Sequence, residues 1–78
     1  MVKPTRITNT IRTLRFTHGE MTQAELADRI GVTRQTVIAI EQGRYSPTLE
    51  LAFRIARVFG VALDDVFQYP DIPEETKQ

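Results

Sequence analysis

Along residues 21–45 the apolar positions repeat every three to four residues, the pattern of helices that bury one face. Gly31 interrupts this pattern and divides it into two short helices, because glycine readily takes the left-handed backbone conformation that ends a helix. Thr22 and Glu25 have the spacing of a capping box, and Thr33 can cap the second helix. Two helices joined by about three residues indicate a helix-turn-helix. The residues expected to face the core are Ala24, Leu26, Ala27, Ile30, Val37 and Ile40.

One more helix is expected before this pair, over residues 6–17. Ile7, Ile11 and Leu14 have helical spacing and form its inward stripe. Phe16, near its end, is expected to cover the edge of the core. His18 lies in the following loop without partners in the sequence pattern, and we interpret it as a surface residue that is neither a ligand nor a base.

Two helices are expected after the pair. Residues 49–59, with Thr48 as the N-cap, are apolar around most of the helix circumference, which in so small a protein indicates the central helix of the core. A polar edge remains, on which Glu50 can pair with Arg54. A short last helix spans residues 63–67. The apolar side chains of the longer helix form two strips, one of Leu49, Ala52, Phe53, Ala56 and Phe59 and one of Leu51, Ile55 and Val58, and any apolar surplus could serve a dimer contact. In the shorter helix Leu63, Val66 and Phe67 are expected to face inward.

The two ends of the chain differ from this helical middle. Residues 1–5 contain Pro4 and no apolar stripe, which predicts a flexible arm, although Lys3 could place it along a phosphate backbone. Residues 68–78 contain two prolines and are acidic, which predicts an extended tail. Tyr69 and Ile72 could instead fold back or meet a partner. The folded domain is therefore expected to span residues 6–67, as an all-α fold of five helices.

Composition excludes several classes of protein. The chain has 78 residues, enough for one core and no separate ligand-binding domain. It has no cysteine and one histidine, which excludes disulfides, thiolate metal sites and multi-histidine zinc sites. No apolar run reaches the roughly eighteen residues of a membrane span, and no signal peptide is visible. We expect a soluble cytoplasmic protein with no metal, no cofactor and no membrane partner.

The distribution of charge is more informative than the net charge of zero. Residues 1–48 carry seven basic and four acidic side chains, whereas residues 49–78 carry three basic and six acidic ones. The basic half contains the predicted helix-turn-helix. This asymmetry favours a nucleic-acid partner for that half.

The exposed side of the second helix carries candidate DNA-reading side chains. Arg34 and Gln35 are suited to bidentate hydrogen bonds with guanine and adenine in the major groove. Thr36, Ile38 and Ala39 can pack against a thymine methyl group. The alternative is an ordinary solvated face on a pair of helices.

Four motifs in a fixed order distinguish these alternatives. They are TQAELA at 22–27, Gly31-Val32-Thr33, RQTV at 34–37 and IEQGRYSPTLELA at 40–52. With them the chain resembles the XRE family of helix-turn-helix regulators, which includes phage repressors and Cro proteins, over residues 7–67. The resemblance implies a compact, lambda-repressor-like DNA-binding domain. Two departures are a loop one residue longer before residue 22 and Phe16 at a position where the family often has a charged residue.

The resemblance also implies roles for individual residues. Arg15 is expected to pair with Glu41 and so to fix the recognition helix against the first helix. Gln23 is expected to contact a DNA phosphate and support the recognition helix, and Arg44 and Tyr45 to hold phosphates, although a plain turn with an exposed arginine remains the alternative there. The expected base-contacting residues are Thr33, Arg34, Gln35, Thr36, Ile38 and Ala39.

The sequence shows no arrangement that supports catalysis, since it has no nucleophile motif, phosphate-binding glycine loop or metal cluster. We therefore predict a sequence-specific transcriptional regulator, acting as a repressor and binding a palindromic operator in double-stranded DNA as a homodimer. The alternative is an antitoxin or other protein-interaction module, whose working surface would be the helix at 49–59 and the tail, with DNA binding secondary.

Overall fold

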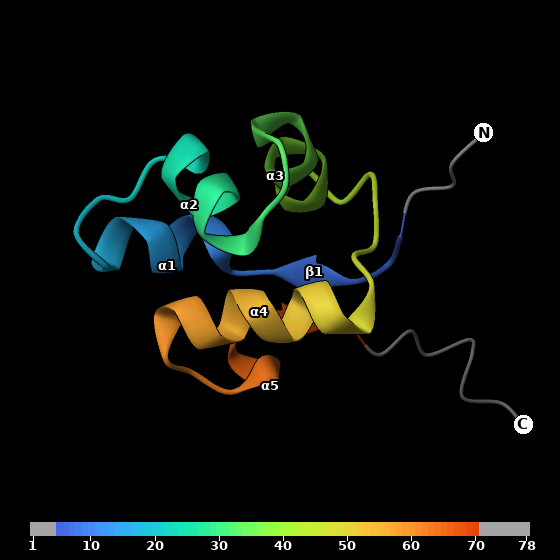
Figure 1. Cartoon of the computed structure of the whole chain (residues 1–78). Coiled ribbons are helices and arrows are strands. Elements are labelled where there is room, and N and C mark those ends of the chain that lie inside the picture. Colours follow the sequence, from blue (N-terminus) through green and yellow to red (C-terminus); the bar gives the residue numbers. More distant parts are fainter. Residues whose placement is uncertain (1–4, 71–78) are drawn as a thin grey trace, which may run out of the picture.

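The computed structural model describes residues 5–70, so the predictions made for residues 1–4 and 71–78 lie outside the described residues. Its elements are β1 (Thr8–Asn9), α1 (Ile11–Thr17), α2 (Gln23–Ile30), α3 (Arg34–Glu41), α4 (Leu49–Phe59), α5 (Leu63–Val66) and β2 (Phe67–Gln68). Figure 1 shows α2 and α3 on one side of α4 and α5 on the other. The predicted five-helix fold is confirmed, with the addition of two short strands.

The helix ends between residues 22 and 60 lie where the capping chemistry predicts them. Glu25 N–H donates to Thr22 Oγ1 at 3.0 Å, and Thr22 N–H donates to Glu25 Oε1 at 2.8 Å, which completes the capping box of α2. Thr33 and Thr48 accept the corresponding N–H bonds at the starts of α3 and α4. Gly31 ends α2 at φ 78°, a left-handed conformation that costs glycine little.

The expected helix over residues 6–17 was wrong at its start, because α1 begins only at Ile11. Residues 8 and 9 form β1, which pairs antiparallel with β2 in the register Thr8–Gln68 and Asn9–Phe67. The side chains before α1 form hydrogen bonds to distant backbone instead of supporting a helical turn. Asn9 Nδ2 donates to Ile40 O at 3.0 Å, and Thr10 Oγ1 donates to Asp65 O at 2.6 Å.

Asn9 therefore joins the N-terminal segment to the end of α3, and replacing its side chain is expected to destabilise the fold. Besides its bond to Ile40, Asn9 Oδ1 accepts the Ile11 N–H at 3.2 Å. Asn9→Ala is expected to lower the free energy of unfolding by about 1–2 kcal/mol, measured by urea denaturation. Thr8→Ala is the control, since its hydroxyl makes only exposed contacts at 3.4–3.5 Å. Equal losses in both variants would contradict a specific role for Asn9.

The core lies between α4 and the other helices. Met21 belongs to it, although its position in a loop gave no periodic signal. The buried apolar residues are Ile11, Met21, Leu26, Ala27, Ile30, Val37, Ile40, Ala52, Ile55, Ala56, Phe59 and Val66. Within residues 5–70, no helix has the length and apolar character needed to cross a bilayer.

Two residues expected at the core, Phe16 and Ala24, are exposed, and those predictions were wrong. Phe16 is 70% exposed, because the loop that follows α1 folds back and brings Met21 to the core instead. Ala24 is exposed on α2. Leu49 and Phe53 are 67% and 49% exposed on the outer side of α4, so they are the apolar surplus of that helix. Helical spacing identifies a face, but only the packing of neighbouring helices decides how wide the buried face is.

His18 is exposed, as expected, yet it has partners. Its Nδ1 lies 2.9 Å from Leu14 O and its Nε2 lies 3.1 Å from Phe59 O. The imidazole also meets the ring of Phe59 edge to face, with 5.2 Å between centroids. His18 thus links the ends of α1 and α4.

Candidate nucleic-acid interface

The outer face of α3 is presented to solvent by the burial of the opposite face. Val37 and Ile40 are 1% and 2% exposed and hold α3 against the core. Arg34 and Gln35 are exposed on its first turn. Thr36, Ile38 and Ala39 are half-buried next to them. The residues predicted to read bases are therefore exposed or half-buried along α3, from the N-cap Thr33 to Ala39.

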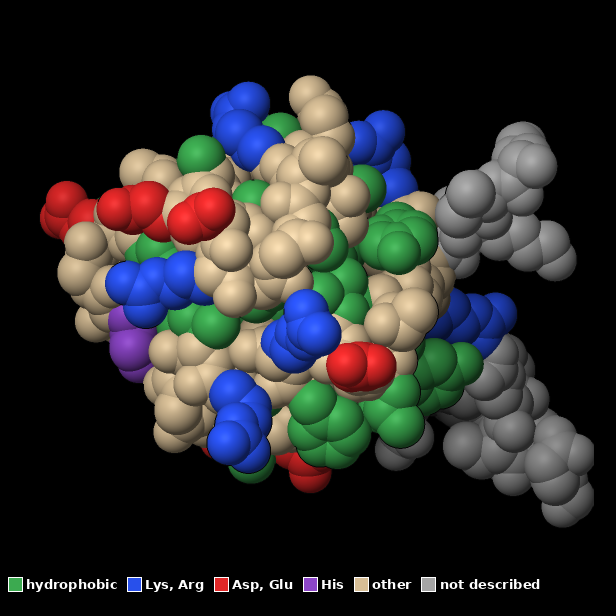
Figure 2. Space-filling model, in the orientation of Figure 1, with side chains coloured by type: hydrophobic (Ala, Val, Ile, Leu, Met, Phe, Trp, Pro, Cys, Tyr) green, Lys and Arg blue, Asp and Glu red, His purple; other side chains and the backbone are tan. Residues whose placement is uncertain are grey.

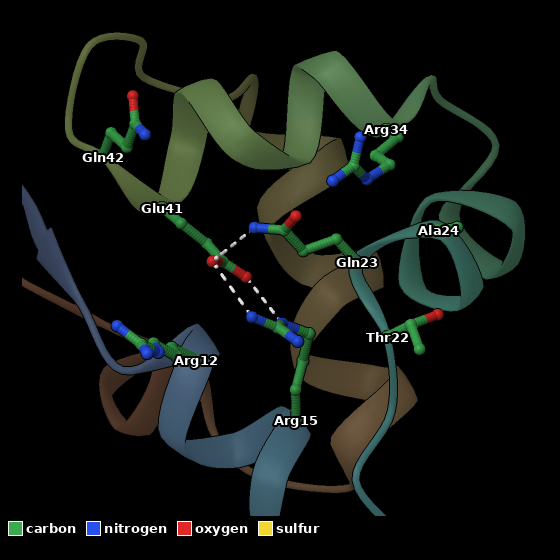
Figure 3. A pocket seen from close by; sticks show the side chains of 8 residues that line it. All are labelled: Arg12, Arg15, Thr22, Gln23, Ala24, Arg34, Glu41 and Gln42. Carbon is green, nitrogen blue, oxygen red and sulfur yellow. Dashed lines mark hydrogen bonds and ion pairs between the residues drawn. The ribbon is translucent and has the colours of Figure 1, made fainter.

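A largely buried polar network fixes the end of α3 (Figure 3). Arg15 Nε donates to Glu41 Oε2 at 2.7 Å, and Arg15 Nη2 donates to Glu41 Oε1 at 3.2 Å. Gln23 Nε2 also donates to Glu41 Oε1, at 3.1 Å, and Arg15 Nη1 donates to Met21 O at 2.9 Å. The side chains of Arg15 and Glu41 are only 15% and 9% exposed. The network connects α1, the start of α2 and the end of α3, so it sets how α3 lies relative to α2.

A hollow of about 570 Å³ opens on the side of α3 that faces this network. Gln23, at the first position of α2, and Arg34, at the first position of α3, line it together, as Figure 3 shows. Helix N-termini offer free N–H groups and a partial positive charge, which suit an anion such as phosphate. The lining residues are Arg12, Arg15, Thr22, Gln23, Ala24, Arg34, Glu41 and Gln42.

A second hollow, of about 610 Å³, lies on the other flank of α3. It brings Arg44 and Tyr45, from the loop after α3, next to three of the predicted base-reading residues of α3. Arg44 is exposed and Tyr45 is half-buried against the core. The residues that line this hollow are Gln35, Thr36, Ala39, Arg44 and Tyr45.

The structure thus divides the predicted site residues between two flanks of one helix. Gln23 and Arg34 lie on one flank, and Arg44 and Tyr45 lie on the other. Sequence reasoning did not single out Arg12, which is exposed on α1 and lines the first hollow. The i, i+3 spacing of Arg12 and Arg15 places both side chains on one face of α1, and that spacing could have identified it.

Charge is distributed unevenly over the molecule. Figure 2 shows Arg side chains at the upper edge, near α3, and others lower down over α4, with the Asp and Glu side chains of the upper half over α2 and the loop before it. Arg34 and Arg44 supply positive charge from the two flanks of α3. A surface with this charge and a projecting helix is suited to the phosphates and the major groove of DNA.

Comparisons with known proteins agree with this geometry. A family model of the helix-turn-helix domain (HTH_3) matches residues 11–66. The chain is 51% identical over 63 residues to an uncharacterized HTH-type transcriptional regulator of Methanocaldococcus jannaschii. This alignment covers 81% of this chain and 94% of that protein. It is 38% identical over 56 residues to the cryptic phage CTXphi transcriptional repressor RstR of Vibrio cholerae. That alignment covers 72% of this chain and 50% of the repressor.

A solved structure has a similar fold. The crystal structure of a hypothetical transcription factor, NHTF, from Neisseria superposes with a TM-score of 0.67 at 31% identity. The similarity covers 86% of this chain and 74% of that protein.

Proposed function

Because the chain belongs to the XRE family of helix-turn-helix transcriptional regulators, we propose that it is a repressor that binds a palindromic operator as a homodimer. Its action is binding to double-stranded DNA, without a catalytic step. The observation that carries the proposal is the exposed outer face of α3, with a hollow that contains basic side chains on each flank. The relative named as a transcriptional repressor supports the repressor role.

In this proposal α3 enters the major groove and its first turn reads bases. Arg34 and Gln35 project freely enough to form bidentate hydrogen bonds with base edges, whereas Thr36, Ile38 and Ala39 offer methyl groups to thymine. Thr33 is already occupied in part, because its Oγ1 accepts the Thr36 N–H at 3.3 Å. It contributes to readout chiefly by fixing the start of α3.

The two flanks hold the phosphate backbone. Gln23 uses one amide hydrogen on Glu41, which leaves its second N–H for a phosphate oxygen at the start of α2. Arg44 and Tyr45 take phosphates on the other side of α3. These contacts set affinity and register, while the sequence information comes from α3.

The proposal is tested by selecting bound sequences from a random DNA pool with the wild-type chain and with Arg34→Ala and Gln35→Ala. Each substitution is expected to cost about 1–3 kcal/mol of binding free energy and to relax base choice at one position of each half-site. Arg57→Ala is the matched control, because Arg57 is exposed on α4 and lines neither flank of α3.

Two outcomes of this selection distinguish sequence-specific recognition of an operator from nonspecific binding to DNA phosphates. A two-fold symmetric site with half-sites about 34–36 Å apart, altered by Arg34→Ala and unaltered by Arg57→Ala, supports the proposal. The contrary outcome is weak binding that enriches no sequence and is lost as the salt concentration rises. Only the nonspecific attraction to DNA phosphates would then be present, and the proposal would be contradicted.

A second candidate function is binding to a partner protein, as in an antitoxin. The observation in its favour is Phe53, which is 49% exposed on α4 beside a hollow that also contains Arg29 and Arg57. Tight binding to another protein, together with failure to enrich any DNA sequence, would favour this function over the repressor.

A further inference from the structure

We infer that an exposed face formed by α4 and the end of α2 binds an acidic segment of another protein, one that also carries a large apolar side chain. The face surrounds a hollow of about 420 Å³. This arginine face is lined by Arg29, Glu50, Phe53, Arg54, Arg57 and Val58. It shares no residue with either hollow beside α3, so the inference goes beyond the proposed repressor and does not depend on it.

The arginine face carries more positive charge than its own acidic side chain can neutralise. Arg54 Nη2 donates to Glu50 Oε2 at 3.4 Å, and its Nη1 donates to Ile30 O at 3.4 Å. Arg29 and Arg57 are exposed, and neither has an ion-pair partner in the described part of the chain. Guanidinium groups without a partner are suited to bidentate hydrogen bonds with carboxylates.

An exposed apolar side chain lies among these charges. Phe53 is 49% exposed, although the opposite side of α4 is buried in the core. Half-buried Val58 lines the same hollow. Figure 2 shows hydrophobic side chains beside Arg side chains over α4. Aromatic and arginine side chains are both enriched in protein–protein interfaces, so the arginine face has the composition of a protein-binding surface.

An acidic protein segment fits this face better than DNA or a second copy of the chain. A phosphate backbone has no apolar side chain to cover Phe53, and the 80% exposed carboxylate of Glu50 would repel it. A two-fold contact with a second copy would place arginines opposite arginines. A segment with carboxylates around one large apolar residue complements both the charge of Arg29 and Arg57 and the ring of Phe53.

The location of the arginine face keeps it apart from the proposed DNA surface. In Figure 2 the basic side chains over α4 lie below those at the upper edge, near α3. A bound segment and DNA would therefore use different residues of the chain. A protein held on the arginine face would be carried to whichever DNA site α3 selects.

The test begins with selection from a phage-displayed pool of random peptides on the full wild-type chain, without DNA. The enriched peptides are expected to contain several aspartates or glutamates around a large apolar residue. One of them is then synthesised with a fluorescent label, and its dissociation constant is measured by fluorescence anisotropy. Replacing its apolar residue with serine should weaken binding by about tenfold. Equal binding of the two peptides would leave charge attraction alone and overturn the inference.

Variants of the chain then locate the bound peptide. Arg57→Glu and Phe53→Ala are each expected to weaken binding by about tenfold or more, through a reversed charge and a lost apolar contact. Both side chains are exposed, so both variants should fold, which circular dichroism checks. The matched controls are Arg44→Glu beside α3 and Phe16→Ala on α1, where Phe16 is 70% exposed. Each control is expected to change the dissociation constant by less than about threefold.

The outcomes distinguish the arginine face from other binding sites. Loss of binding in Arg57→Glu and Phe53→Ala, with binding retained in both controls, supports the inference. Loss in Arg44→Glu, or displacement of the peptide by double-stranded DNA, would place the peptide beside α3 and overturn it. About tenfold tighter binding after Glu74→Gln and Glu75→Gln would assign the face to the chain's own acidic residues and overturn an external partner. None of these results depends on which DNA sequence the chain selects, so this inference and the proposed function can fail separately.

Discussion

Replacing Glu41 with alanine is expected to lower the free energy of unfolding by up to about 3–5 kcal/mol, because it leaves the largely buried Arg15 guanidinium without its counter-charge. The two side chains are 15% and 9% exposed, so water cannot easily replace the lost carboxylate. Gln23 loses its acceptor in the same step. The loss is measured by urea denaturation at one fixed protein concentration, since the stability of an oligomer depends on concentration.

Glu50→Ala provides the matched control for this prediction. Glu50 also pairs with an arginine, Arg54, at 3.4 Å, but those side chains are 80% and 55% exposed. Exposed pairs contribute little, so a loss of at most about 1 kcal/mol is expected. Glu41→Gln, which retains the side-chain shape and one acceptor oxygen, should fall between the two. A Glu41→Ala variant no less stable than Glu50→Ala would show that the buried network does not hold α3 in place.

Ile40→Ala is expected to lower the free energy of unfolding by about 2–5 kcal/mol, because it leaves a cavity where α3 meets the core. Ile40 is 2% exposed, so the lost methylene and methyl groups are ones that the core packs against. Its backbone carbonyl, which accepts the bond from Asn9, is retained in the variant. At temperatures where the variant remains folded, its choice of DNA bases should match that of the wild type. Thermal unfolding and sequence selection on the same preparation measure the two effects.

Ile38→Ala is the matched control, since it makes the same change two residues earlier on the outer face of α3. Ile38 is half-buried and lies outside the buried core, so a smaller loss of stability is expected. Its effect should fall on DNA affinity instead, through a lost contact with a thymine methyl group. If Ile40→Ala changed base choice while Ile38→Ala did not, the assignment of the two faces of α3 would be reversed.

These two pairs of variants describe how α3 is held. One face is fixed by apolar packing, and its end is fixed by the polar network on Glu41. A rigid recognition helix needs both, because a helix of eight residues has little stability of its own. Precise placement of Arg34 and Gln35 against base edges depends on that rigidity.

The helix ends between residues 22 and 60 could be predicted from the sequence because their causes are local. Each threonine cap bonds to an N–H three residues along the chain, and Gly31 takes its conformation without help from distant residues. The outer face of α3 was likewise predictable, since the burial of Val37 and Ile40 leaves Arg34 and Gln35 outside.

The start of α1 could not be predicted in this way. Asn9 and Thr10 bond to Ile40 and Asp65, which are 31 and 55 residues away, and β1 exists only because β2 lies beside it. The helical spacing of Ile7 and Ile11 predicted one continuous helix. Strand β1 and the hydrogen bonds of the Asn9 and Thr10 side chains delay the start of α1 to Ile11.

By itself, therefore, the sequence determined that there are five helices, the caps of α2, α3 and α4 and the side chains that α3 presents, because capping and periodicity act over three to four residues. The tertiary structure decided what depends on contacts between distant segments. It moved Phe16 to the surface and Met21 to the core, placed Arg12 and Arg34 in the lining of one hollow, and left Leu49 exposed. These features depend on which surfaces the neighbouring helices cover. The spacing of apolar residues along one helix does not specify which other helices pack against it.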